Sequence, residues 1–163
     1  MRVLVTGASG FSGAYIARFL ALEGHSVVGV YRRETPFLSR LHGVGRIELM
    51  RAFLERAADI SGPYDAVVHA AATSPAPGVG LRTMVRDNVL ATLALAEAAV
   101  AWNCRAFVFF SSMSVFGRVS VPVVDESSPV QDPGAYGTTK YICEQLLLER
   151  ADVLPSLSLR LPG

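Results

Sequence analysis

The fold follows from one stretch near the N-terminus, Arg2-Val3-Leu4-Val5-Thr6-Gly7-Ala8-Ser9-Gly10-Phe11-Ser12-Gly13. Its first five residues form a short, apolar and β-branched run, which is typical of a strand buried on both faces of a sheet. Three glycines follow in a Gly-x-x-Gly-x-x-Gly pattern. Apolar residues then recur at helical spacing up to Leu22, and Gly24 stands where a left-handed C-cap is needed. The stretch therefore predicts a strand, a glycine turn and a helix.

The glycine turn suits the binding of a pyrophosphate through backbone groups. The first turn of a helix carries unpaired N–H groups and a partial positive charge, so it attracts an anion that can come close. Gly7 would make the tight turn, Gly10 would allow contact with phosphate, and Gly13 would let helix and strand pack closely. A turn that serves packing alone is the alternative. A second apolar strand at residues 25–31 favours the dinucleotide interpretation.

Length and composition indicate one domain, residues 1–163, in which 51% of the residues are hydrophobic. The net charge of +1 favours neither nucleic acid nor an anionic membrane as a partner. No apolar run reaches the roughly 18 to 20 residues of a membrane span, and no signal-peptide pattern is present. Cys104 and Cys143 lie far apart without ligand-type spacing. We expect a cytoplasmic protein without a disulfide or a metal site.

The end of the second strand bears on the choice of cofactor. An acidic residue at this position accepts hydrogen bonds from the adenosine ribose and repels a 2′-phosphate. Here the position is Tyr31, and Arg32 and Arg33 follow it. Two guanidinium groups are suited to clamping a 2′-phosphate, so the residues favour NADP over NAD. The alternative is that the two arginines are solvated on the surface and that Glu34 partly neutralises them. NAD therefore remains an alternative cofactor.

The rest of the chain alternates strand and helix. Strands are predicted at residues 46–50, 64–72, 105–110 and near 160–163, and helices at 51–60, 81–102 and from 134 onward. This order predicts an α/β fold of the Rossmann type, a doubly wound parallel sheet in three α/β/α layers with strand order 3-2-1-4-5-6. Small residues Ala70, Ala71 and Ala72 end the fourth strand and leave room for a ligand, or they pack the core. His69 is interpreted as a hydrogen-bonded core residue.

Two later features place polar chemistry beside the glycine turn. The fifth strand delivers Ser111 and Ser112 to the same carboxyl edge of the sheet, and a helix carries Tyr136 and Lys140 four residues apart, on one face. A nearby cation favours the phenolate of a tyrosine, so Tyr136 would exchange a proton with a substrate oxygen that Ser112 also contacts. A surface lysine beside a half-buried tyrosine is the plainer alternative for the pair taken alone.

In these features the chain resembles the extended short-chain dehydrogenase/reductases, that is, the NAD(P)-dependent epimerase/dehydratase family. The matching segments run from the first residues to the last. They are residues 6–13, 69–72, 88–89, 109–117, 136–140 with Glu144, and 159–163.

The resemblance implies a catalytic trio of Ser112, Tyr136 and Lys140 and a nucleotide-linked sugar as substrate. Lys140 would also hold the nicotinamide ribose. A homodimer formed through the helices at 81–102 and 136–153 is also implied. A reductase of a non-sugar carbonyl compound and a non-catalytic NADP-sensing domain are the alternatives. The cofactor-binding residues expected from the turn, the strand ends and the trio are Gly7, Ser9, Gly10, Phe11, Ser12, Gly13, Tyr31, Arg32, Arg33, Ala70, Ala71, Ala72, Ser111, Tyr136 and Lys140.

The chain departs from the family pattern in three places. Tyr31 replaces the acidic residue that many members carry, and the Asp that commonly follows the third strand is not evident around Met50 and Arg51. The C-terminal part that supplies most of the substrate site in the family is absent. We expect either a piece of a longer protein or a short form that takes its substrate lid from a partner.

Overall fold

A computed structural model of the chain describes residues 1–162. All six strands pair in parallel in the order β3-β2-β1-β4-β5-β6, which confirms the predicted topology. The order reverses between β1 and β4, and open sheets of this kind bind ligands at the carboxyl edge beside such a switch point. The strands are β1 (Arg2–Thr6), β2 (Ser26–Tyr31), β3 (Ile47–Arg51), β4 (Ala66–His69), β5 (Ala106–Ser112) and β6 (Ser156–Leu161).

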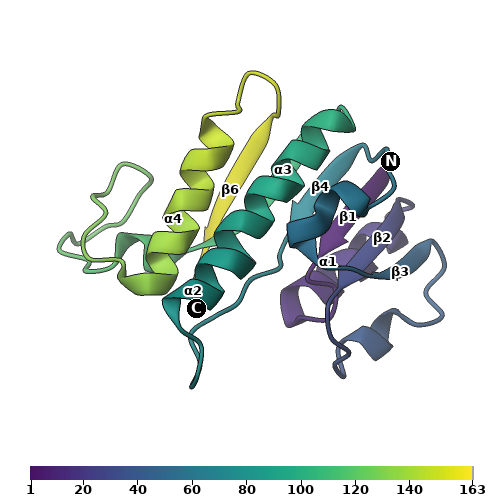
Figure 1. The fold of residues 1–163 in the computed structure, drawn as a ribbon, viewed down its shortest axis with the longest axis horizontal. Helices are drawn as coiled ribbons and strands as arrows, with labels where there is room; N and C mark the ends of the chain where they lie inside the picture. Colours follow the sequence, from purple (N-terminus) through teal and green to yellow (C-terminus); the bar gives the residue numbers. More distant parts are fainter. Residues whose placement is uncertain (163) are drawn as a thin grey trace.

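Helices cover the sheet from both sides. Figure 1 shows α3 and α4 next to each other on one face, with the chain between β3 and β4 beside them. The helices are α1 (Phe11–Leu22), α2 (Leu81–Met84), the π-helical η3 (Val85–Leu90), α3 (Ala91–Ala101) and α4 (Gly134–Leu148). Short 3₁₀ turns are η1 (Leu38–Leu41), η2 (Leu54–Asp59) and η4 (Met113–Phe116). None of the helices formed by residues 1–162 is long and apolar enough to cross a membrane.

Alternate residues of the central strands build two cores, one on each face of the sheet. In β1, Leu4 packs with α3 and α4, whereas Val3 and Val5 pack with α1. All three side chains are buried, as expected for a strand covered on both faces. At the β6 end one face lacks such cover, and Leu157 is 56% exposed. Gly24 ends α1 with φ +89°, as predicted.

The long helix predicted at residues 81–102 is divided by a π-helical segment. The Thr92 hydroxyl donates to the Asn88 carbonyl at 2.6 Å, and the wider turn directs the Asn88 side chain toward Thr73. π-helical turns often occur at functional sites. The sequence did not indicate this break, because apolar residues continue on both sides of it, from Met84 to Ala91 and Leu95.

Two other predicted elements differ from those in the structure. The fourth strand starts at Ala66 and ends at His69, not at Ala72, because the Ala71 N–H leaves the ladder and donates to the Thr6 hydroxyl at 3.3 Å. The segment predicted as a helix at 51–60 is only the 3₁₀ turn η2, interrupted at Arg56. The three alanines therefore form a loop at the carboxyl edge, where a ligand can approach their backbone.

Candidate active site

The glycine turn joins β1 to α1 with almost no space between backbone segments. Gly7 has φ +72°, which favours glycine, and a Cβ at Gly13 would lie 2.1 Å from the Gly7 carbonyl oxygen. Gly10 is the N-cap of α1 and has no side chain to occupy the amides of the first turn. The predicted roles of Gly7 and Gly13 in the backbone are confirmed. The turn also fits a pyrophosphate, because helix N–H groups stand at an open edge.

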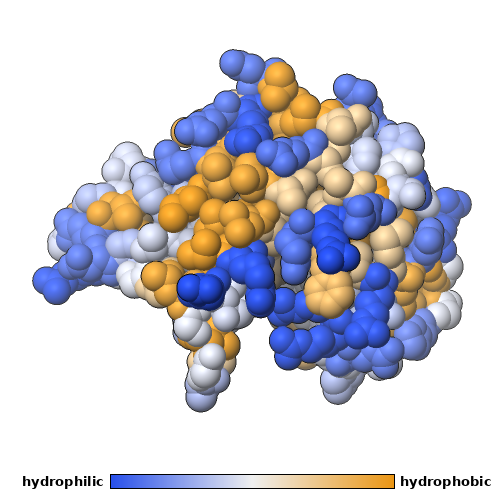
Figure 2. Space-filling view, in the orientation of Figure 1, coloured by the Kyte–Doolittle hydropathy of each residue, from blue (hydrophilic) through white to orange (hydrophobic). Residues whose placement is uncertain are grey.

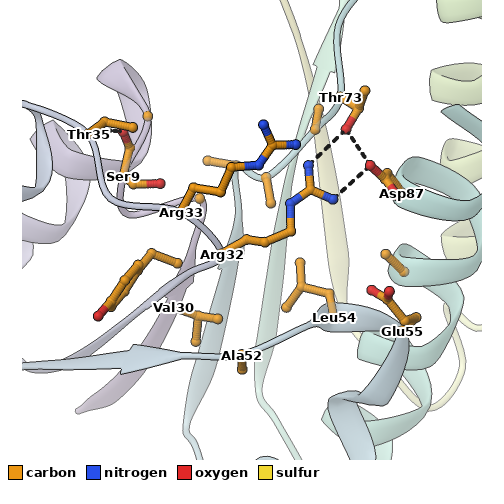
Figure 3. A pocket seen from close by; sticks show the side chains of 17 residues that line it. Ser9, Val30, Arg32, Arg33, Thr35, Ala52, Leu54, Glu55, Thr73 and Asp87 are labelled. Atoms are coloured by element: carbon orange, nitrogen blue, oxygen red, sulfur yellow. Dashed lines mark hydrogen bonds and ion pairs between the residues drawn. The ribbon is translucent and has the colours of Figure 1, made fainter. Parts of the chain in front are cut away.

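A cleft of about 300 Å³ opens beside this turn (Figure 3). Nine of the residues predicted to bind cofactor line it: Gly7, Ser9, Gly10, Tyr31, Arg32, Arg33, Ala70, Ala71 and Ala72. Phe11, Ser12, Gly13, Ser111, Tyr136 and Lys140 do not line it. Phe11 is 62% exposed beside the turn. The other lining residues were not among the expected cofactor-binding residues, and they are Val30, Thr35, Ala52, Leu54, Glu55, Thr73, Asp87 and Ala91.

Arg32 and Arg33 differ in their surroundings. The Arg32 guanidinium lies 2.7 Å from the Asp87 carboxylate and 3.4 Å from the Thr73 hydroxyl, across the cleft from β2. Arg33 is exposed and makes no ion pair within the part of the chain that the structure describes. The sequence suggested two equivalent guanidinium groups, and the structure shows one bound to a carboxylate.

Ser112, Tyr136 and Lys140 come from two elements that meet at the same edge of the sheet as the glycine turn. Ser112 ends β5 and caps η4, where its Oγ accepts the Ser114 N–H at 3.1 Å. Lys140 is 2% exposed, and its Nζ donates to the Phe110 carbonyl at 2.7 Å. The Lys140 Nζ lies 5.8 Å from the centre of the Tyr136 ring. The predicted helix thus directs phenol and ammonium to one region.

The expected lowering of the tyrosine pKa is wrong for the chain alone. Burial raises the pKa of Tyr136, against a smaller opposite effect of the Ser74 hydroxyl. Burial also lowers the pKa of Lys140 to about 8. The ammonium is turned toward the Phe110 carbonyl, so it does not offset the desolvation of the phenol. Tyr136 is therefore a neutral phenol at pH 7, able to donate a proton.

Ser111 lies near the carboxyl end of β5, as predicted, and its side chain has a partner within the protein. Its hydroxyl donates to Glu144, and the same carboxylate binds Arg160 through an Nη2–Oε2 distance of 2.7 Å. This buried group connects β5, α4 and β6. Its members hold α4 against the sheet, and the hydroxyl proton of Ser111 is committed to Glu144.

His69 is fully buried between two threonines, as its interpretation as a core residue requires. Thr92 donates to the Asn88 carbonyl, so its oxygen must accept the Nε2–H of His69 at 2.9 Å. Nδ1 then accepts the Thr6 hydroxyl at 2.7 Å. The ring is thus neutral with its proton on Nε2.

Acid is expected to destabilise the chain through His69. Burial, and secondarily the Lys140 charge, lowers the pKa of His69 to about 3, whereas an unfolded histidine titrates near its ordinary value. Below the unfolded pKa only the unfolded state takes up this proton, so stability is lost as the pH falls. Between about pH 7 and about pH 5 the loss from this residue is about 2 kcal/mol. Urea unfolding at both pH values measures it, and the loss should be smaller in His69→Asn. Equal pH dependence in the two proteins would contradict the assignment.

No group of three His, Cys, Asp or Glu side chains is arranged to hold a metal ion within residues 1–162.

Comparison with known proteins finds relatives that match this chain over most of its length. The chain is 28% identical to UDP-glucose 4-epimerase of Caenorhabditis elegans, over 91% of this chain and 49% of that protein. It is 33% identical to 2-alkyl-3-oxoalkanoate reductase of Stenotrophomonas maltophilia, over 98% and 50%. A solved structure of UDP-glucuronic acid 4-epimerase from Bacillus cereus in complex with NAD superposes with a TM-score of 0.84 at 26% identity, over 100% of this chain and 57% of that one.

The chain thus spans about half the length of the curated relatives that it matches. A family model, that of the NAD dependent epimerase/dehydratase family, also matches this chain from residue 3 to residue 162. With this match and the observed fold, the chain belongs to the NAD dependent epimerase/dehydratase family.

Proposed function

We propose that this chain is the cofactor-binding part of an NADP-preferring oxidoreductase of the epimerase or dehydratase type, acting on a nucleotide-linked sugar. The observation that carries the proposal is that the glycine turn and the trio Ser112, Tyr136 and Lys140 lie at the same edge of one sheet. A dinucleotide whose pyrophosphate lies at the turn can then extend toward the trio. Had the two groups lain at opposite edges, no single cofactor would reach both.

The roles of the trio follow from their surroundings. A bound nicotinamide dinucleotide would accept a hydride from the substrate and could return it. Tyr136 would exchange a proton with the substrate oxygen, and its raised pKa favours donation in the reductive direction. Ser112 would hold the same oxygen. Lys140 would donate to the ribose hydroxyls, because its other N–H groups remain after one donates to Phe110.

The preference for NADP is supported by the end of β2. Tyr31 brings no negative charge to the cleft, and the exposed Arg33 is free to meet a 2′-phosphate. Isothermal titration calorimetry of the chain with NADP and NAD tests both parts of the proposal. We expect NADP to bind about tenfold more tightly, a difference of about 1.4 kcal/mol. No heat with either nucleotide would overturn the proposed site, and tighter binding of NAD would overturn the preference alone.

A second candidate is a reductase of a non-sugar carbonyl compound. It is favoured by the 33% identity to the 2-alkyl-3-oxoalkanoate reductase, whose name specifies a substrate that is not a sugar. The two candidates share the trio and differ in substrate. Assays of the whole protein with NADPH and a 3-oxoacid, or with a nucleotide sugar, separate them. A non-catalytic NADP sensor is disfavoured because all three residues of the trio are present.

We also propose that two copies pair through helices α3 and α4 in a reducing compartment, the cytoplasm. Figure 2 shows apolar side chains gathered over these helices. Leu90, at the end of η3, and Ile142 and Leu148, on α4, are 50%, 39% and 65% exposed. The two cysteines are buried free thiols. Sedimentation equilibrium tests the pairing, and a monomer at all concentrations would argue against it.

A further inference from the structure

The cleft beside the glycine turn is crossed by one ion pair. Arg32 extends from the end of β2, and its Nη1 donates to the Asp87 Oδ2 at 2.7 Å on the opposite wall (Figure 3). Its Nη2 donates to the Thr73 hydroxyl at 3.4 Å. Both terminal nitrogens of this guanidinium therefore have partners within the protein. A 2′-phosphate bound at the end of β2 would compete with Asp87 and Thr73 for this guanidinium, because the planar group cannot face both places at once.

Asp87 does not depend on Arg32 for its own hydrogen bonds. Its Oδ1 accepts from the Nε of Arg86 at 2.7 Å, and its Oδ2 also accepts from the Thr73 hydroxyl at 2.8 Å. The Asp87 side chain is 4% exposed, whereas that of Arg32 is 35% exposed. Because Arg86 and Thr73 remain as partners, Arg32 can leave without stranding a buried carboxylate. Arg32 is therefore the mobile member of the pair, and Asp87 is the fixed one.

The carboxylate stays ionised throughout the working pH range. Burial by itself would raise the pKa of Asp87, but the hydrogen bonds from Arg86, Arg32 and Thr73 lower it to about 2. A permanent negative charge at this wall attracts Arg32 and repels a phosphate.

We propose that Asp87 sets the cofactor preference by holding the guanidinium of Arg32, which a 2′-phosphate must take from it. This inference rests on the proposed dinucleotide site. NADP binding breaks the Arg32–Asp87 pair, whereas NAD binding leaves it in place. Asp87 thus keeps the preference for NADP smaller than two arginines would otherwise give, and it makes Arg33 the first cation that the phosphate meets.

The test is Asp87→Asn, titrated with NADP and with NAD by calorimetry. Asparagine keeps the size of the side chain and removes the charge that holds Arg32. NADP should bind about tenfold more tightly than to the unsubstituted chain, and NAD affinity should stay within about twofold. Retained NAD binding also reports that the variant is folded. Asp87→Ser, a smaller uncharged residue, gives the same comparison if asparagine is not accommodated.

Two controls separate competition for Arg32 from other effects. Glu34→Gln removes a negative charge from the same loop, at an exposed residue that pairs with no cation among residues 1–162. It should change NADP affinity by less than about twofold. In the Arg32→Ala background, Asp87→Asn should give no gain in NADP affinity, because the guanidinium that it would release is absent.

Three results would overturn the inference. The first is weaker NADP binding by Asp87→Asn, which would mean that the ion pair holds Arg32 in position for the phosphate. The second is an equal gain in NADP affinity from Glu34→Gln. The third is a gain in NADP affinity from Asp87→Asn that persists in the Arg32→Ala background. If the unsubstituted chain binds neither nucleotide, the proposed site fails instead, so the two failures are distinguishable.

Discussion

Replacing Gly13 by alanine is expected to remove nearly all binding of NAD and NADP. The added Cβ would lie 2.1 Å from the carbonyl oxygen and 2.6 Å from the carbonyl carbon of Gly7. Both are backbone atoms at the strand end, so no flexible side chain can move aside. The start of α1 must shift, and the first-turn N–H groups shift with it. We expect affinity to fall about a hundredfold, or about 3 kcal/mol, and stability to fall by about 3 kcal/mol.

Calorimetry and thermal unfolding of Gly13→Ala measure the two effects. Gly45→Ala is the matched control, because no heavy atom lies within 4 Å of its added Cβ and its φ is not in the left-handed region. Gly10→Ala should be intermediate, since its Cβ would lie 3.3 Å from the Gly7 oxygen. Wild-type affinity in Gly13→Ala would mean that the turn does not contact the cofactor.

The sheet and the turn could be predicted because their signals are local. Each buried strand is a continuous apolar run, and the parallel order follows from the alternation of strand and helix and from the handedness of the crossover. Gly7 and Gly13 were identifiable because the φ of Gly7 favours glycine and the contact distance at Gly13 leaves no space for a Cβ. His69 was assigned correctly because a single histidine within an apolar strand can satisfy its two nitrogens only from neighbouring elements.

The rest of the site depends on distances across the fold. Asp87 lies on the helical segment that was expected to be continuous, and nothing in its sequence neighbourhood indicates that it meets Arg32, 55 residues away. Leu54 and Glu55 line the cleft from η2, a 3₁₀ turn where the sequence predicted a helix. The pKa of Tyr136 was predicted in the wrong direction because the spacing of Tyr136 and Lys140 does not reveal where the ammonium points.

Tyr136→Phe should lower turnover by the whole protein about a thousandfold, since general acid–base groups contribute effects of about this size. Phenylalanine keeps the ring and the packing, and it loses only the group that exchanges a proton. Tyr136 does not line the cleft beside the glycine turn, so affinity for NADP and NAD should stay within about twofold. Absorbance of the reduced nicotinamide follows turnover, and calorimetry follows binding.

Tyr141→Phe is the control for this experiment, because Tyr141 lies on the same helix and is half-buried like Tyr136. The two residues are five positions apart, so they point to different sides of α4 and only Tyr136 shares a face with Lys140. Loss of a hydroxyl at Tyr141 should leave turnover within about twofold, the scatter expected for a peripheral substitution.

Unchanged turnover in Tyr136→Phe would remove the phenol from the mechanism. It would leave the Lys140 ammonium, held at a pKa of about 8, as the remaining titratable member of the trio. An equal loss of turnover in both variants would instead indicate an effect on the packing of α4. A chemical role of Tyr136 would make the two variants differ.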